Sequence, residues 1–108
     1  MNDDALTVSV RTLSANGAKL ALARAEAAAL AKGLAVSIAV VDSAGNLLAF
    51  LRVNNACVTC IEAAIRKART AANLGAPTKL FEDLLQGGMT SLLAFDFISP
   101  SQGGVPIM

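Results

Sequence analysis

Apolar residues recur along this chain with two different spacings, which divide it into predicted helices and strands. Residues 14–32 have the spacing of a helix, which Ser14 can cap and Gly33 can end in the left-handed conformation. Charged side chains lie off one apolar stripe of this helix, and we expect the stripe to face the core. The stripe consists of Leu20, Ala23, Ala27, Leu30 and Leu34.

Two strands are predicted after this helix. Residues 35–41 are apolar except for Ser37, which is typical of a strand in the middle of a sheet with both faces covered. Residues 42–46 form a turn cluster and the chain returns over 47–53, so the two strands are expected to pair as an antiparallel hairpin. The Asp42 carboxylate is expected to cap amides of the turn, and a catalytic base is the alternative.

A longer helix is predicted to follow the hairpin. Asn54 and Asn55 end the second strand, and the helix continues to about Leu74, with Glu62 and Arg66 placed to form an ion pair. Its apolar residues should face inward and its charged residues outward. The inward residues are Ile61, Ala64, Ile65, Ala68 and Ala72, and the outward ones are Glu62, Arg66 and Arg69.

The last third of the chain is predicted to contain a short helix and one more strand. Residues 75–77 stop the long helix, Thr78 caps the short one, and Gly87 and Gly88 end it. Residues 91–98 have the pattern of a strand, and 99–104 that of a loop. This region carries few charges, so we expect it to be buried within the domain or against another chain.

Length and charge limit the function classes. The 108 residues indicate one domain over 1–108, in which the alternating residues 6–12 favour a short strand or, with 1–5, an extended arm. Nine basic and eight acidic residues give a net charge of +1, which argues against a nucleic-acid or anionic membrane partner. Uncharged runs are shorter than the roughly 18 residues of a membrane span, and the acidic start without a basic leader favours the cytoplasm.

The sharpest local motif is Cys57-Val-Thr-Cys60 near the start of the long helix. The positive end of a helix lowers the pKa of nearby thiols, so the two cysteines could form a redox pair. The alternative, which we favour, is two buried thiols that act as small hydrophobic side chains in a reduced compartment. Two ligands do not complete a zinc site, and we predict no metal site.

Further candidates are basic and glycine residues. Lys67 and Arg69 beside Arg66 form either a small anion-binding patch or an ordinary solvated helix face. The glycine pairs at 87–88 and 103–104 lack the spacing of a phosphate-binding loop and are interpreted as turns. Gly104 and Pro106 could still line a cleft, because glycine admits a ligand close to the backbone and proline fixes the chain beside it.

Several short motifs in one order resemble the GlcG/HbpS family of haem-binding and PduO C-terminal-like domains, over about residues 14–107. They are Ile-Ala-Val-Val-Asp at 38–42, Gly-Asn-Leu-Leu-Ala-Phe at 45–50, Arg52, Ile-Glu-Ala-Ala at 61–64, Arg-Lys-Ala-Arg-Thr-Ala at 66–71, Pro-Thr at 77–78 and Gly-Gly-Val-Pro-Ile at 103–107. The resemblance implies an α/β (α+β) domain with a single antiparallel sheet flanked by helices in profilin-like layers.

The resemblance also implies an oligomer. Family members commonly form dimers or larger rings, and a strand pair and a closing helix typically follow the Gly-Gly-Val-Pro-Ile segment. This chain ends there, so we expect a bare sheet edge or face and dimerisation across it.

Relatives are associated with haem or corrinoid cofactors. Histidine is absent from this chain, which leaves Met89, Met108, Cys57 and Cys60 as poor haem ligands. Relatives keep a basic residue near the ligand cleft at the position of Arg52, which could hold a carboxylate; an ordinary ion pair with a surface acid is the equally favoured alternative. The acidic residue that often follows it in the family is replaced by Asn54 and Asn55.

These observations favour a non-catalytic, homo-oligomeric module that binds a small ligand or cofactor. Its cleft is expected near Arg52, the helix start with Cys57 and Cys60, and the segment with Gly104 and Pro106. One alternative is an enzyme that uses the Cys57 and Cys60 thiols or turns over a bound cofactor. Another is a structural assembly domain without a ligand.

Overall fold

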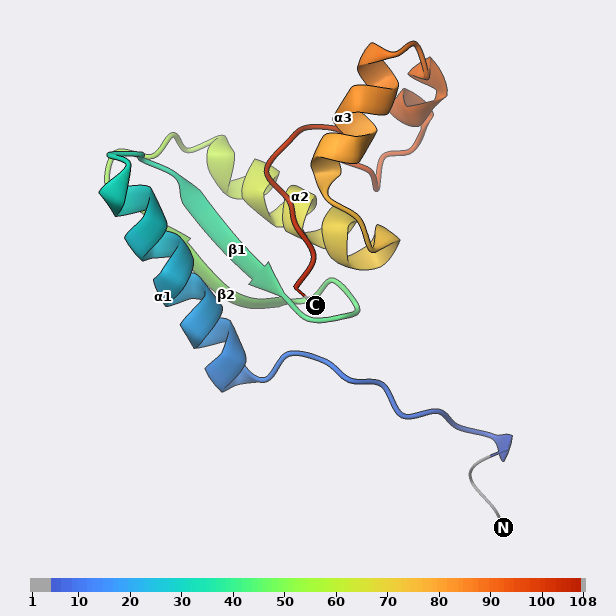
Figure 1. Ribbon diagram of the computed structural model, residues 1–108, viewed down its shortest axis with the longest axis horizontal. Coiled ribbons are helices and arrows are strands. Elements are labelled where there is room, and N and C mark those ends of the chain that lie inside the picture. The colour runs from blue at the N-terminus through green and yellow to red at the C-terminus, as the bar shows by residue number, and fades with distance from the viewer. Residues whose placement is uncertain (1–4, 108) are drawn as a thin grey trace.

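The computed structural model describes residues 5–107 of the chain (Figure 1). The elements follow in the order α1 (Ala15–Ala31), β1 (Ser37–Val41), β2 (Leu47–Arg52), α2 (Cys60–Leu74), α3 (Thr78–Gln86) and a 3-10 helix, η2 (Thr90–Ala94). α1 packs against both strands, α2 packs against β1, and α3 lies between α2 and η2. The predicted fold class, helices around one antiparallel sheet, is confirmed.

The segment before α1 forms no strand. Residues 7–14 run outside helix and sheet, away from the body of the protein (Figure 1), so the strand expected over 6–12 is wrong for these residues. The Thr12 hydroxyl oxygen accepts a hydrogen bond from the Ser43 amide at 2.9 Å, which ties the base of the segment to the hairpin turn. Residues 1–4 of the predicted arm lie outside the described residues, and the single-domain division stays a prediction.

α1 begins and ends as predicted, but it buries a different face. The Ser14 side chain accepts a hydrogen bond from the Gly17 amide at 3.0 Å, and Gly33 adopts φ 67° after the helix. The residues expected to face the core are all exposed, whereas Ala18 and Ala29 are buried. The prediction was wrong because α1 is apolar on more than one face, and its alanine side lets the helix backbone approach the hairpin most closely.

The hairpin forms as predicted. β1 and β2 are antiparallel, with Ala39 opposite Phe50, and the register shifts after Val40. The Asp42 carboxylate accepts hydrogen bonds from the Ala44 and Asn46 amides at 3.0 and 2.9 Å, which confirms its role as a turn cap. β1 is not the middle strand that its apolar sequence indicated, because within residues 5–107 it pairs with β2 alone.

α2 follows the sequence pattern in its end and its outward side, but its buried residues are Thr70 and Ala71, whereas the five residues expected to face inward are half-buried. Gly75 ends it with φ 64°, and the charged residues Glu62 and Arg66 point outward. The expected ion pair between these two is wrong: Arg66 instead donates a hydrogen bond to the Asp96 carbonyl, which fastens the chain after η2 to α2. Arg69 donates to the Gly45 carbonyl at 3.2 Å and fastens the hairpin turn to the other end of α2.

The C-terminal third differs most from the prediction. Residues 90–94 form η2 where a strand was expected, since no described strand lies beside them to supply hydrogen bonds. Leu92 is buried, but other large apolar residues of this region remain exposed, so the domain itself does not cover them. They are Leu93, Phe95, Phe97, Val105 and Ile107.

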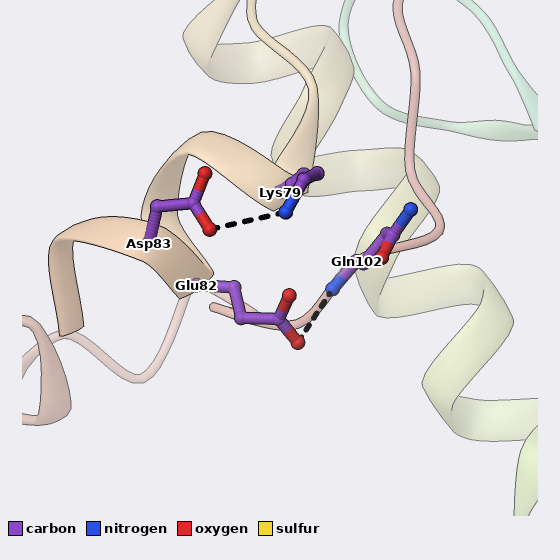
Figure 2. A network of polar contacts seen from close by, with 4 residues as sticks. All are labelled: Lys79, Glu82, Asp83 and Gln102. Carbon is purple, nitrogen blue, oxygen red and sulfur yellow. Dashed lines mark hydrogen bonds and ion pairs between the residues drawn. The ribbon is translucent and has the colours of Figure 1, made fainter. Parts of the chain in front are cut away.

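Figure 2 shows two polar contacts of α3, one within the helix and one to the C-terminal segment. Lys79 and Asp83 form an ion pair at 3.1 Å along the exposed side of α3, and the Gln102 amide donates to the Glu82 carboxylate at 3.4 Å. α3 ends at Gly87, as predicted. No helix within the described part of the chain is long and apolar enough to cross a membrane.

Candidate ligand-binding cleft

A cleft of about 1230 Å³ opens beside β1. β1 lines it along its whole length, and the facing sides of α1 and α2 and residues 103–107 complete the walls. Figure 1 shows the C-terminal segment running past α2 toward the end of β1. The cleft therefore combines parts of the chain that are far apart in the sequence.

Small side chains on α2 account for much of the open space. Ala64, Ala68 and Ala72 are four residues apart and line the cleft as one face of the helix, with Ala63 beside them. α1 adds Ala21 and Ala25 from the opposite wall. Because alanine ends at Cβ, these faces leave an apolar cavity where leucine or isoleucine would have filled the core.

β1 presents free backbone groups to this space. The Val36 carbonyl accepts from the Val53 amide at 3.0 Å, and backbone groups alternate in direction along an antiparallel strand. From this register, the amides and carbonyls of Ser37, Ala39 and Val41 point away from β2. The buried Ser37 hydroxyl also has no hydrogen-bond partner among the described residues. A bound group can therefore pair with the backbone groups of β1 that point away from β2.

The charged side chains at the cleft are mainly basic. Lys67 is half-buried on the wall formed by α2, and Arg11 lies at the edge formed by the segment before α1. Asp42 is the acidic residue of the described lining, and its carboxylate already accepts two turn amides. A ligand with an anionic group is therefore favoured over a cationic one.

Residues 103–107 are held in the cleft by Thr78. The Thr78 hydroxyl accepts from the Gly104 amide at 2.8 Å, and the Thr78 amide donates to the Gly104 carbonyl at 2.9 Å. Thr78 is fully buried and makes no side-chain capping bond to α3, so its predicted capping role was wrong. A Cβ at Gly104 would overlap the Lys67 carbonyl oxygen, so only glycine allows this approach.

The predicted site residues fall into two groups. Cys60, Gly104 and Pro106 line the cleft, whereas Arg52 and Cys57 lie outside the lining. Arg52 is exposed at the end of β2, opposite Ser37 and on the side of β1 away from the open edge.

The sequence analysis missed several cleft residues. Ser37 was noted only as a break in an apolar strand, and Lys67 was paired with Arg69 as a surface patch. Arg69 bonds to the Gly45 carbonyl, while Lys67 lines the cleft. The alanines at intervals of four along α2 were the available signal, although a face of small side chains either packs closely against a neighbour or leaves a space beside it, so the spacing alone did not identify a cleft.

The two cysteines are neither buried nor free. A disulfide joins Cys57 and Cys60, whose Cα atoms are 5.4 Å apart, and Cys57 is exposed. This corrects the expectation of two buried thiols in a reduced state. The turn at residues 57–59 brings the cysteines close enough to bond, which their spacing in the sequence permits but does not require.

The cleft does not fit haem ligation. Histidine is absent from the sequence, and Met89 lies on the surface away from the described lining. Cys60 lines the cleft, but its sulfur is bonded to Cys57, and Met108 lies outside the described residues. No cluster of three or more metal-binding side chains occurs among residues 5–107. The described walls therefore offer apolar contact and positive charge without an axial ligand for iron.

Comparisons with known proteins agree on one family. The model of the family "Haem degrading protein HbpS-like" matches residues 13–108. Protein GlcG of Escherichia coli strain K12 is 32% identical over 96 residues, which cover 89% of this chain and 72% of GlcG. GlcG of Escherichia coli O6:H1 matches to the same extent.

Solved structures with the same fold extend this likeness to the backbone. The Klebsiella pneumoniae protein ORFY has a TM-score of 0.87 at 28% identity, covering all of this chain and 75% of ORFY. HbpS has a TM-score of 0.86 at 33% identity, covering 94% of this chain and 72% of HbpS. A double mutant of Streptomyces reticuli HbpS has a TM-score of 0.84 at 34% identity, covering 95% of this chain and 70% of the mutant.

Proposed function

Because the chain belongs to the HbpS-like family, we propose that it is a non-catalytic, homo-oligomeric module that binds a small ligand in the cleft beside β1. The observation that carries this proposal is the cleft itself, with alanine-lined walls, an open strand edge and the half-buried Lys67. Ligand sites are typically apolar cavities with a few placed polar groups, which is this composition.

The ligand class follows from the cleft lining. An apolar body fits against the alanines of α1 and α2, and a carboxylate or similar anion fits beside Lys67 and the free amides of β1. Gly104 and Pro106 border the same space. The family's description names haem degradation, but the described lining of this cleft offers no suitable iron ligand, so we favour an apolar carboxylate over haem or a corrinoid.

Binding can be tested with 8-anilinonaphthalene-1-sulfonate, a fluorescent apolar anion. We expect saturable binding to the intact protein, weakened about 5- to 20-fold by Lys67→Gln, which removes the positive charge at the wall of the cleft. Ala68→Leu should reduce binding by filling the cleft. Lys79→Gln is the matched control, because Lys79 is exposed on α3 outside the lining, and it should leave binding unchanged. Equal affinities for Lys67→Gln and Lys79→Gln would contradict the proposal.

The assembly part of the proposal is supported by the exposed stripe of α1. Its members within α1 follow one another at steps of three, four and three residues, which is the spacing of a seam between two paired helices; they are Leu20, Ala23, Ala27 and Leu30. Leu20 and Leu30 are 52% and 60% exposed. A second copy carries the same stripe, so a two-fold dimer would cover both stripes at once.

The oligomeric state of paired variants tests this interface. Leu30→Glu places a charge on the stripe and should convert the oligomer into a monomer in sizing with light scattering. Leu80→Glu is the control, because Leu80 is similarly exposed but lies on α3. A wild-type protein that is monomeric at micromolar concentration would overturn the assembly proposal, and dissociation by Leu80→Glu alone would exclude α1 as the interface.

The proposed location is the cytoplasm. Disulfides in that compartment are mostly transient and belong to catalytic or redox-sensing cysteines, since cellular thiols keep others reduced. The bond between Cys57 and Cys60 must therefore be reversible if the location is right.

A further inference from the structure

The Cys57–Cys60 disulfide contributes little as a cross-link. It joins residues three positions apart, so it closes a very short loop. A disulfide stabilises a protein mainly by restricting the unfolded chain, and this effect grows with the length of the closed loop. Here the loop length is near its minimum. The fold around it is already held by α2 and the hairpin. A structural role therefore explains the bond poorly.

The two cysteines differ in exposure. Cys57 is exposed, and the two residues after it are exposed as well, Val58 by 70%. Cys60 is half-buried and lines the cleft. Cys57 is therefore the residue that an external thiol meets more readily from solvent. The exposed apolar Val58 between them gives an approaching partner a contact surface beside the reactive sulfur.

The position of Cys60 also suits a leaving sulfur. It is the first residue of α2, where the positive end of the helix favours a thiolate. The Thr59 hydroxyl donates to Cys57 Sγ at 3.6 Å and orients that sulfur in the turn. Cys57, the more exposed cysteine, is therefore open to attack. Cys60, whose sulfur is released by the attack, lies at the start of α2, where its negative charge is stabilised.

We propose that Cys57–Cys60 is a thiol–disulfide exchange site that accepts two electrons from a dithiol. A thiolate of the dithiol attacks Cys57 Sγ, a mixed disulfide forms, and the Cys57–Cys60 bond breaks with its electron pair on Cys60 Sγ. The second thiol of the reductant, as a thiolate, then attacks the reductant's first sulfur, which is bonded to Cys57 in the mixed disulfide. This releases Cys57 as a thiolate. The dithiol becomes a disulfide, and both cysteines end reduced.

Single-cysteine variants test the asymmetry that this site requires. Cys60→Ser keeps Cys57, and Cys57→Ser keeps Cys60, so each reports one sulfur. Each variant is incubated with oxidised glutathione, and mass spectrometry measures the rate at which the mixed disulfide forms. This rate should be about ten-fold or more higher for Cys60→Ser than for Cys57→Ser. The same rates measured in urea are the control, because unfolding removes the difference in exposure and the two variants should then react alike.

The wild-type protein supplies the second measurement. Dithiothreitol should reduce the bond in the folded protein without denaturant, with circular dichroism unchanged, and the reduced protein should return electrons to oxidised glutathione. Reduction only in urea, or equal rates for the two folded single-cysteine variants, would overturn the proposal. The fluorescent-anion titration tests the cleft separately, because its variants at Lys67 and Ala68 change neither cysteine.

Discussion

Thr78 fixes the C-terminal segment beside the cleft through one side-chain oxygen. Its hydroxyl oxygen lies 2.8 Å from the Gly104 amide and 3.4 Å from the Gly104 carbonyl, and the residue is fully buried. Replacement by valine keeps the shape of the side chain and removes the hydroxyl. The Gly104 amide is then left buried without its acceptor, which is the costly form of hydrogen-bond loss.

The size of the effect follows from that unpaired amide. An unsatisfied buried donor costs about 1–3 kcal/mol. Unfolding entropy is roughly 2.1 cal/mol/K per residue, so for 108 residues a loss of about 1 kcal/mol lowers Tm by about 4 °C. We therefore expect Thr78→Val to lower Tm by about 4 to 13 °C. Thr78→Ser, which keeps the hydroxyl, should recover most of the loss.

Amide hydrogen exchange locates the effect in the molecule. The Gly104 amide should exchange slowly in the wild type and about 5- to 150-fold faster in Thr78→Val, which is the same free energy expressed as a rate ratio. Thr90→Val, at an exposed threonine of η2, is the control for the substitution itself. The reasoning is refuted if Thr78→Val and Thr90→Val have the same Tm, or if Gly104 exchange is unchanged.

Three further predictions concern stability measured by thermal or urea unfolding. Gly45→Ala should destabilise by about 1–3 kcal/mol, because Gly45 has φ 87° and a Cβ there would lie 2.9 Å from the Arg69 side chain; an unchanged Tm would contradict this. Ser14→Ala should cost about 1 kcal/mol through loss of the α1 cap, and Ser14→Asp should restore it. Lys79→Ala should change stability by less than about 0.5 kcal/mol, because the partners of its ion pair are more than half exposed; a larger loss would show that the contact is stronger than its exposure indicates.

Much of the local structure could be predicted from the sequence, because it depends on contacts within a few residues. Ser14 caps α1 through an amide three positions away, and Asp42 binds the amides of its own turn. Gly33 and Gly75 end their helices in a conformation that other residues adopt at a cost. The ordered motifs also identified the family, which the family model and the likeness to GlcG confirm.

The site could be predicted only in part. Cys60, Gly104 and Pro106 do line the cleft, but Lys67 and Ser37 were not connected with it. Whether Cys57 and Cys60 bond to each other depends on the turn that joins them to α2, which their spacing alone does not determine.

Tertiary packing decided which helix face is buried and which segments form strands, where the sequence allowed more than one outcome. α1 is apolar around much of its circumference, and contact with the hairpin selected the alanine face over the leucine stripe. Residues 91–98 have the composition of a strand, yet a strand forms only where a neighbour supplies hydrogen bonds, and none of the described strands lies there. The edge of β1 is open, with a cleft beside it, because no described strand pairs with that edge. Sequence patterns record local preference, whereas pairing and burial depend on which distant segment occupies the adjoining space.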